Sequence, residues 1–140
     1  MRALFFSFLF GVASVSWGQA TFSSKLTELI TVPASATSPY KWIDREIILK
    51  DNSILIKTYQ KEGDTDIEIW DKIDPEVNIS KNENKLIRTF YTFLIFDNVR
   101  LESLFRVIGD REGVVYLIER ELLLADGSED ESLITRYHVN

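Results

Sequence analysis

The chain has 140 residues, no cysteine, and a net charge of −6 from 16 basic and 22 acidic residues. This acidic balance argues against nucleic acid or an anionic membrane surface as the partner, since both attract clustered lysine and arginine. The lack of cysteine excludes disulfides, thiolate nucleophiles, zinc–thiolate sites and iron–sulfur clusters.

The start of the chain has the pattern of a signal peptide. Arg2 precedes an apolar run that ends at Val15, small residues stand at Gly18 and Ala20, and no acid occurs before Glu28. A membrane anchor is the alternative, but it would need about twenty apolar residues, and this run is shorter. We therefore expect cleavage near Ala20, a secreted or periplasmic location, and no transmembrane anchor afterwards. Cleavage removes one arginine and no acid, so the net charge falls from −6 to −7.

The next segment, residues 21–40, is rich in Ser, Thr and Ala and contains Pro33 and Pro39. This composition predicts a linker or N-terminal arm. Within it, Lys25–Val32 has enough apolar side chains to form a short helix or a first strand. The predicted organisation is a signal peptide over 1–20, a linker or arm over 21–40, and a single β domain over 41–140.

From Trp42 onward, apolar runs rich in β-branched and aromatic residues alternate with turn formers, which is typical of strands. We predict strands over 42–50, 53–61, 65–73, 86–97, 103–109, 114–125 and 132–139. Residues 73–85 are expected to form an irregular connection, and 114–125 also suits a helix. The predicted fold class is all-β, an antiparallel and mostly up-and-down meander forming a small sandwich or barrel.

Alternation along the strands predicts which side chains are buried. Ile67, Ile69 and Ile73 share one face of their run and Glu68 lies on the other, so we expect buried isoleucines and a solvent-exposed glutamate. The run 86–96 is apolar on both faces, which predicts a central strand covered on both sides.

Residues for acid–base or metal chemistry are few. The single histidine, His138, lies two residues from the end of the sequence, where chains fray, and it cannot form a zinc site with other His or Cys ligands. The acidic run Asp126–Glu131 could form a loose calcium loop, but Glu131 stands where an EF-hand needs glycine, so a solvated acidic hairpin is the simpler reading. No glycine-rich phosphate-binding loop occurs. We predict no cofactor and no metal site.

Paired carboxylates leave one enzymatic alternative. Glu68 lies two residues from Trp70 on the same strand face, and Glu119 and Glu121 also share a face. A carboxylate-dependent glycan hydrolase could use Glu68 or Glu119 with a second acid. Because alternation places these side chains in solvent beside basic residues, we expect surface ion pairs instead.

The aromatic residues are the remaining functional signal. In a barrel, Trp70, Phe90, Phe93 and Phe96 could line a cavity for an apolar ligand, whereas in a filled sandwich they would be core. The sequence lacks the Gly-x-Trp signature of lipocalin-type barrels, because Trp42 is preceded by Tyr40-Lys41, and we identify no family.

We therefore expect an exported, non-enzymatic binding or interaction domain for a protein partner or a small apolar ligand. In the protein-binding version, the last predicted strand, Leu133–Val139, would lie at a sheet edge and accept a partner strand. The alternatives are the glycan hydrolase above and a structural subunit of an envelope assembly.

Overall fold

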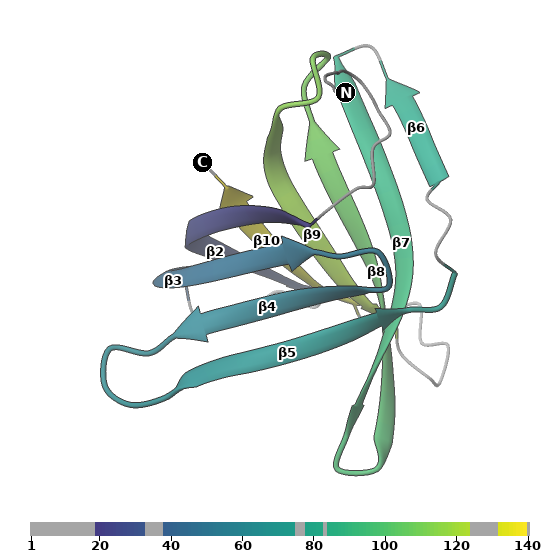
Figure 1. Cartoon of the computed structure of the whole chain (residues 1–140). Coiled ribbons are helices and arrows are strands. Elements are labelled where there is room, and N and C mark those ends of the chain that lie inside the picture. The colour runs from purple at the N-terminus through teal and green to yellow at the C-terminus, as the bar shows by residue number, and fades with distance from the viewer. Residues whose placement is uncertain (1–18, 33–37, 75–77, 83, 124–131, 140) are drawn as a thin grey trace, which may run out of the picture.

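The computed structural model describes residues 19–32, 38–74, 78–82, 84–123 and 132–139, in which the regular structure is all β-strand (Figure 1). In this part of the chain nine strands follow one another: β2 (Ala20–Val32), β3 (Tyr40–Leu49), β4 (Ser53–Tyr59), β5 (Thr65–Lys72), β6 (Asn78–Asn82), β7 (Lys85–Phe96), β8 (Val99–Gly109), β9 (Val115–Leu123) and β10 (Ser132–Val139).

The strands close into a barrel. They pair antiparallel in the order β5-β4-β3-β2-β10-β9-β8-β7-β6. A short additional ladder, in which Asp71 and Lys72 of β5 pair with Phe93 and Thr92 of β7, joins the two ends into an eight-stranded ring. β6 lies outside the ring on the edge of β7 (Figure 1). The predicted antiparallel meander is confirmed, and of the two architectures it is the barrel.

The segment after the predicted leader is a barrel strand, so the expectation of a linker over its first part is wrong. β2 pairs with β3 on one side and β10 on the other. A bulge at Lys25 shifts its register between Ser24 and Leu26. Because a bulge displaces the inward–outward alternation by one residue, the apolar side chains follow a spacing that also suits a helix. Residues 33–37 lie outside the described part.

Two other segments clarify the sequence prediction. β9, at Val115–Leu123, is a strand, which confirms the strand prediction over a helix for the described part of 114–125. β6 pairs with Lys85–Thr89 of β7 where an irregular connection was expected. Its five residues are all exposed, so no apolar periodicity marked it in the sequence.

The core lies inside the ring. Phe105 and Trp70 meet edge to face with ring centroids 5.9 Å apart, and both are almost fully buried. An eight-stranded barrel is just wide enough for side chains to meet at its axis. The buried core cluster contains Ile47, Leu49, Ile54, Ile56, Trp70, Phe90, Phe105, Val107, Ile118, Tyr137 and Val139.

On β5, the predicted assignment of faces is wrong. Trp70 is 2% exposed, whereas Ile67 and Ile69 are 55% and 47% exposed on the outer face. Glu68 lies on the inner side with Trp70, as shown by the hydrogen bond that the Trp70 indole N–H donates to Glu68 Oε1. The interior of a small barrel has room for the large Trp70 ring of β5, and the alternation of the strand then places Ile67 and Ile69 outside.

On β7, the expected cover of both faces is also absent from the described structure. Phe90 and Thr92 face inward and are buried, but Tyr91 and Ile95 on the outer face are 48% and 57% exposed. β7 is central in the hydrogen-bonded sheet, and its outer face is open to solvent.

Candidate functional site

The four aromatic residues predicted to line a ligand cavity do not form one site. Trp70 and Phe90 belong to the buried core. Phe93 lies on the outer face under the guanidinium of Arg100, 4.1 Å from its ring centroid. Phe96 ends β7 and is exposed at the tip of the β7–β8 hairpin. Trp70 and Phe90 are therefore core residues, whereas Phe93 and Phe96 lie on the solvent side of the barrel wall.

The two glutamates of the enzymatic alternative lie on opposite faces of the barrel wall. Glu68 accepts a hydrogen bond from Arg120 Nη1 inside the barrel at 3.0 Å. Glu119 precedes Arg120 on β9 and therefore points outward, where Arg136 Nε donates to it at 2.6 Å and Arg106 Nη1 at 3.3 Å. Both carboxylates are held in ion pairs, as expected. The expected solvent exposure is wrong for Glu119, whose outward side chain is only 11% exposed, whereas the side chain of the inward Glu68 is 37% exposed.

Each strand of the ring contributes at least one polar side chain to the barrel interior. Hydrogen bonds join eight of these side chains in three groups, and five of the eight are buried hydroxyl residues while three are charged. We call this set the polar belt: Thr27, Arg45, Thr58, Glu68, Thr92, Ser103, Arg120 and Thr135. Sequence reasoning missed it because its members are separated along the chain and because the inward face of β5 was misassigned.

The charges of the two arginines of the polar belt both act on the buried hydroxyl of Tyr137. Arg45 donates to Thr58 Oγ1 at 3.0 Å and also to Thr27, and its guanidinium lies 5.5 Å from the ring centroid of Tyr137. Arg120 donates to Thr135 Oγ1 at 3.2 Å. Burial raises the pKa of the Tyr137 hydroxyl, while the charges of Arg120 and Arg45 act to lower it.

The polar belt carries more positive than negative charge. Its two arginines face one carboxylate, Glu68, and no carboxylate in the described part of the chain lies within ion-pair distance of Arg45. The Arg120 Nε–H is buried and has no acceptor, and it is the only such side-chain atom among the described residues. Buried donors and charges normally have partners, so this arrangement can accept an anionic group.

A second feature is the open edge of β5. Residues Thr65–Trp70 pair with β4 on one side, but the ladder to β7 includes only Asp71 and Lys72, extended by a bond from Ile73 N to Tyr91 O at 2.9 Å. Beyond this point β5 and the β7–β8 hairpin diverge (Figure 1). The backbone of Thr65–Trp70 thus has no strand partner on this side within the described structure.

Exposed apolar side chains flank this open edge. They come from the outer faces of β5 and β7 and from the tip of the β7–β8 hairpin, where Asp97 and Asn98 form the turn. Large exposed apolar patches are uncommon on monomeric proteins and often mark interaction sites. We call this surface the apolar seam: Ile67, Ile69, Ile73, Tyr91, Ile95, Phe96 and Val99.

The strand predicted to lie at an edge does not. β10 pairs with β2 over Ser132–Val139 and with β9 over Leu133–His138. The proposal that Leu133–Val139 accepts a partner strand is therefore wrong, because closure of the barrel places the last strand between two others.

His138 lies on the outer face of β10, with its Nε2 3.5 Å from Glu28 Oε1. Among the described residues, no group of three or more His, Asp or Glu side chains is arranged to hold a metal ion. The acidic run Asp126–Glu131 lies outside the described residues.

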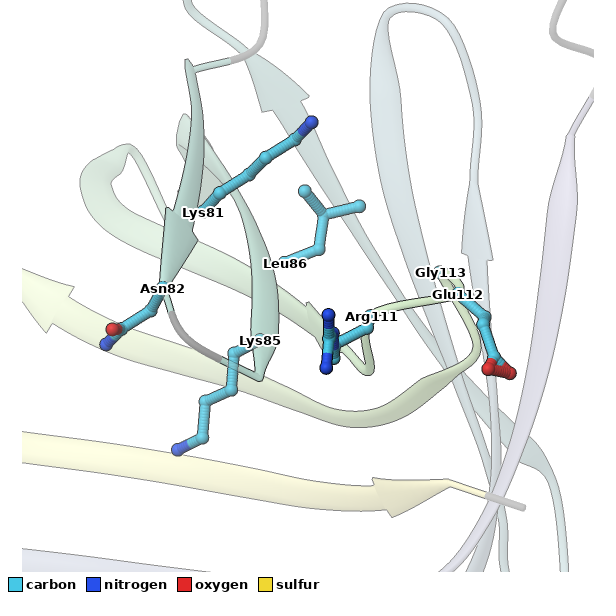
Figure 2. A pocket seen from close by; sticks show the side chains of 7 residues that line it. All are labelled: Lys81, Asn82, Lys85, Leu86, Arg111, Glu112 and Gly113. Atoms are coloured by element: carbon cyan, nitrogen blue, oxygen red, sulfur yellow. The ribbon is translucent and has the colours of Figure 1, made fainter.

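Shallow hollows lined by described residues occur at both ends of the barrel. One, of about 370 Å³, lies between the β6–β7 hairpin and the β8–β9 turn, where Lys81 and Arg111 flank Leu86 and Glu112 points away (Figure 2). The other, of about 730 Å³, is lined by Trp42 and Tyr59 among charged residues. The charged side chains of both hollows are exposed to solvent, which screens them and weakens their hold on a ligand.

Comparison with known proteins gives no relative: no family model, no curated protein and no solved structure matches the chain. The described residues contain no helix, and so none with the length and hydrophobicity to cross a bilayer.

Proposed function

We propose that this chain is an exported interaction domain that binds a partner protein by adding one of the partner's extended segments to the open edge of β5. The observation that carries the proposal is the unpaired backbone of Thr65–Trp70 beside the apolar seam. Unpaired strand edges are templates for strand addition, in which main-chain hydrogen bonds supply affinity and side-chain contacts supply specificity.

The side chains of β5 indicate what the partner segment looks like. Along Thr65–Trp70, the outer face presents Ile67 and Ile69, and the inner face presents Asp66 and Glu68, with no basic residue. A complementary strand would carry apolar residues on its outer face and basic residues on its inner face. Because side chains alternate between the two faces of a strand, a short extended segment with alternating apolar and basic residues would meet both requirements.

The edge has only part of the usual protection against pairing. Natural edge strands are commonly blunted by proline, by a bulge, by lysine or by inward-pointing charges, and of these the edge has only the inward charges of Asp66 and Glu68. Thr65–Trp70 contains no proline or lysine and pairs regularly with β4. This supports a protein partner over a small apolar ligand, since the core residues once considered for such a ligand pack against one another.

A random-peptide phage library panned against residues 21–140 tests the proposal. We expect enriched peptides to alternate apolar and basic residues, and hydrogen exchange to show protection of the Thr65–Trp70 amides in the presence of a selected peptide. Ile69→Lys should abolish binding, while Ile79→Lys, at an isoleucine on β6 that is even more exposed, should leave it unchanged. Protection located on β6, or no enriched pattern, would contradict the proposal.

The exported location is part of the proposal and has its own test. β2 begins at Ala20, and cleavage after this residue would leave its pairs from Thr21 onward, starting with Thr21 and Ile48. The intact mass of the protein recovered outside the cytoplasm should correspond to a chain beginning at Thr21. Recovery of the full-length mass in the cytoplasm would contradict export.

A further inference from the structure

We infer that the barrel also binds a small monocarboxylate with an apolar body, whose carboxylate lies on the polar belt between Arg45 and Arg120. This site is separate from the β5 edge and does not depend on the proposed function. It rests on three features of the barrel interior: unbalanced charge, unused donors and a layer of leucines next to the belt.

The charge of the polar belt calls for one more negative group. Arg45 and Arg120 contribute two positive charges and Glu68 contributes one negative charge, which leaves a net charge of +1. The guanidinium of Arg45 is partly buried and has only hydroxyl partners, so a carboxylate at that point would give it the charged partner that it lacks. A monoanion matches this charge, whereas a dianionic phosphate would leave a surplus negative charge beside Glu68.

The unused donors have the geometry that a carboxylate needs. Arg120 uses Nη1 for Glu68 and Nη2 for Thr135, and its Nε–H is buried without an acceptor. Arg45 uses Nε and Nη1 for hydroxyl oxygens, which are weaker partners than a carboxylate. Guanidinium groups present planar, forked donors that fit the two oxygens of a carboxylate.

The layer next to the belt is apolar and incompletely buried. Each of four neighbouring strands carries a leucine two residues from its belt residue, toward the end of the barrel that holds the β7–β8 hairpin. These are Leu94, Leu101, Leu122 and Leu133. Leu94 pairs across the sheet with Leu101, and Leu122 with Leu133. All four are only half-buried, which leaves apolar surface for the body of a ligand.

The order of the layers sets the orientation of the ligand. Along each of these four strands, the core residue lies on one side of the belt residue and the leucine lies on the other, although Leu94, Leu101 and Leu122 also pack against the core cluster. A carboxylate that reaches the belt from the leucine side keeps its apolar body among the leucines. This arrangement predicts that binding strengthens with alkyl length and requires the charged head.

The test uses residues 21–140 and a series of straight-chain alkanoates from acetate to decanoate at constant ionic strength and pH 7. We expect the melting temperature to rise with chain length, by about 5 °C for the longer members at saturating concentration. The matching alcohols should give no such rise, because they lack the charge. No rise with any alkanoate, or an equal rise with the alcohols, would overturn the inference.

Substitutions in the belt have opposite expected effects on calorimetric affinity. Arg45→Gln should weaken decanoate binding about tenfold or more, because it removes a charged donor. Glu68→Gln should tighten binding several-fold, because it frees Arg120 from its competing carboxylate. Arg100→Gln, which removes an exposed arginine paired with Glu102 on the outer face, should leave affinity unchanged.

A belt that serves only stability gives a different pattern. In that case Arg45→Gln and Glu68→Gln would both lower the melting temperature, and neither would change the shift that decanoate produces. If Glu68→Gln weakens binding, the inference is also overturned. Ile69→Lys separates this site from the β5 edge, because it should abolish peptide binding and leave decanoate binding intact.

Discussion

Glu68 Oε1 accepts two hydrogen bonds at 3.0 Å, one from Arg120 Nη1 and one from the indole N–H of Trp70. The guanidinium of Arg120 also lies 5.3 Å from the Trp70 ring centroid. Glu68 and Arg120 lie on β5 and β9, which are not neighbours in the sheet. The contact therefore crosses the interior, and it ties the strand with the open edge to the opposite wall of the barrel.

Loss of this ion pair should destabilise the barrel. Glu68→Gln leaves the inward guanidinium of Arg120 without its carboxylate, and we expect the free energy of unfolding to fall by about 1–3 kcal/mol. Urea denaturation measures the change. Glu102→Gln is the matched control, since its pair with Arg100 is exposed on both sides and should contribute less than about 0.5 kcal/mol. Equal effects of the two substitutions would show that the inner pair is as well solvated as the outer one.

The same substitution at two phenylalanines should separate core from surface. Phe105 is fully buried against Trp70, so Phe105→Ala should lower the free energy of unfolding by about 3–5 kcal/mol. Phe96 is 64% exposed at the hairpin tip, so Phe96→Ala should change it by less than about 0.5 kcal/mol. Thermal or urea unfolding of the two variants checks this, and a large loss from Phe96→Ala would mean that the hairpin tip packs on the barrel.

Local pattern was sufficient to identify most strands because each is bounded by turn formers and carries β-branched or aromatic residues. The boundaries of β3, β4, β5, β7 and β9 differ from the predicted ranges by a few residues at most. β8 begins earlier than expected, at Val99, because the two-residue turn at Asp97 and Asn98 extends the hairpin. Such boundaries depend on turn geometry, which composition alone does not specify.

The assignment of faces failed where the closed shape of the sheet decides the outcome. In the predicted run 65–73, three isoleucines share one face and Trp70 is the one apolar residue on the other, so a count of apolar residues favours the isoleucines as the buried face. The barrel instead buries Trp70 and pairs Glu68 with Arg120. The polar belt was missed for the same reason, since Arg45, Glu68 and Arg120 meet only when distant strands surround one interior. Barrel closure also removed the edge expected at β10 and created one at β5.

The β7–β8 turn holds two non-glycine residues in the left-handed region, Asp97 at φ 50° and Asn98 at φ 64°. Two-residue hairpin turns of this kind favour glycine at the second position, because a Cβ atom is strained there. Asn98→Gly should therefore raise the free energy of unfolding by about 0.5 kcal/mol. Asn98→Val should lower it by about 1–2 kcal/mol, because a β-branched side chain is disfavoured at positive φ. Chemical denaturation checks both, and opposite signs would mean that the turn relaxes to another type.

The buried hydroxyl of Tyr137 predicts a loss of stability at alkaline pH. Burial raises its pKa above the ordinary value of 10.0, an effect that the nearby arginines oppose. The unfolded chain releases this proton near pH 10.0, whereas the folded chain retains it to higher pH. The folded state then binds more protons, so the contribution of Tyr137 is complete below pH 10.0 and is lost as pH rises through the folded pKa.

Comparison of variants isolates this effect from the lysines that titrate in the same range. Burial lowers the pKa of Lys72, so that residue favours the folded state as pH rises and opposes the loss from Tyr137. Tyr137→Phe should make the free energy of unfolding fall less steeply between about pH 9 and pH 11 than in the unsubstituted protein. In Tyr59→Phe, the free energy of unfolding should still fall almost as steeply as in the unsubstituted protein. Tyr59 lies at the surface, and its raised pKa comes mainly from its hydrogen bond to Glu46. Parallel pH profiles for Tyr137→Phe and the unsubstituted protein would show that folding does not shift the pKa of the Tyr137 phenol.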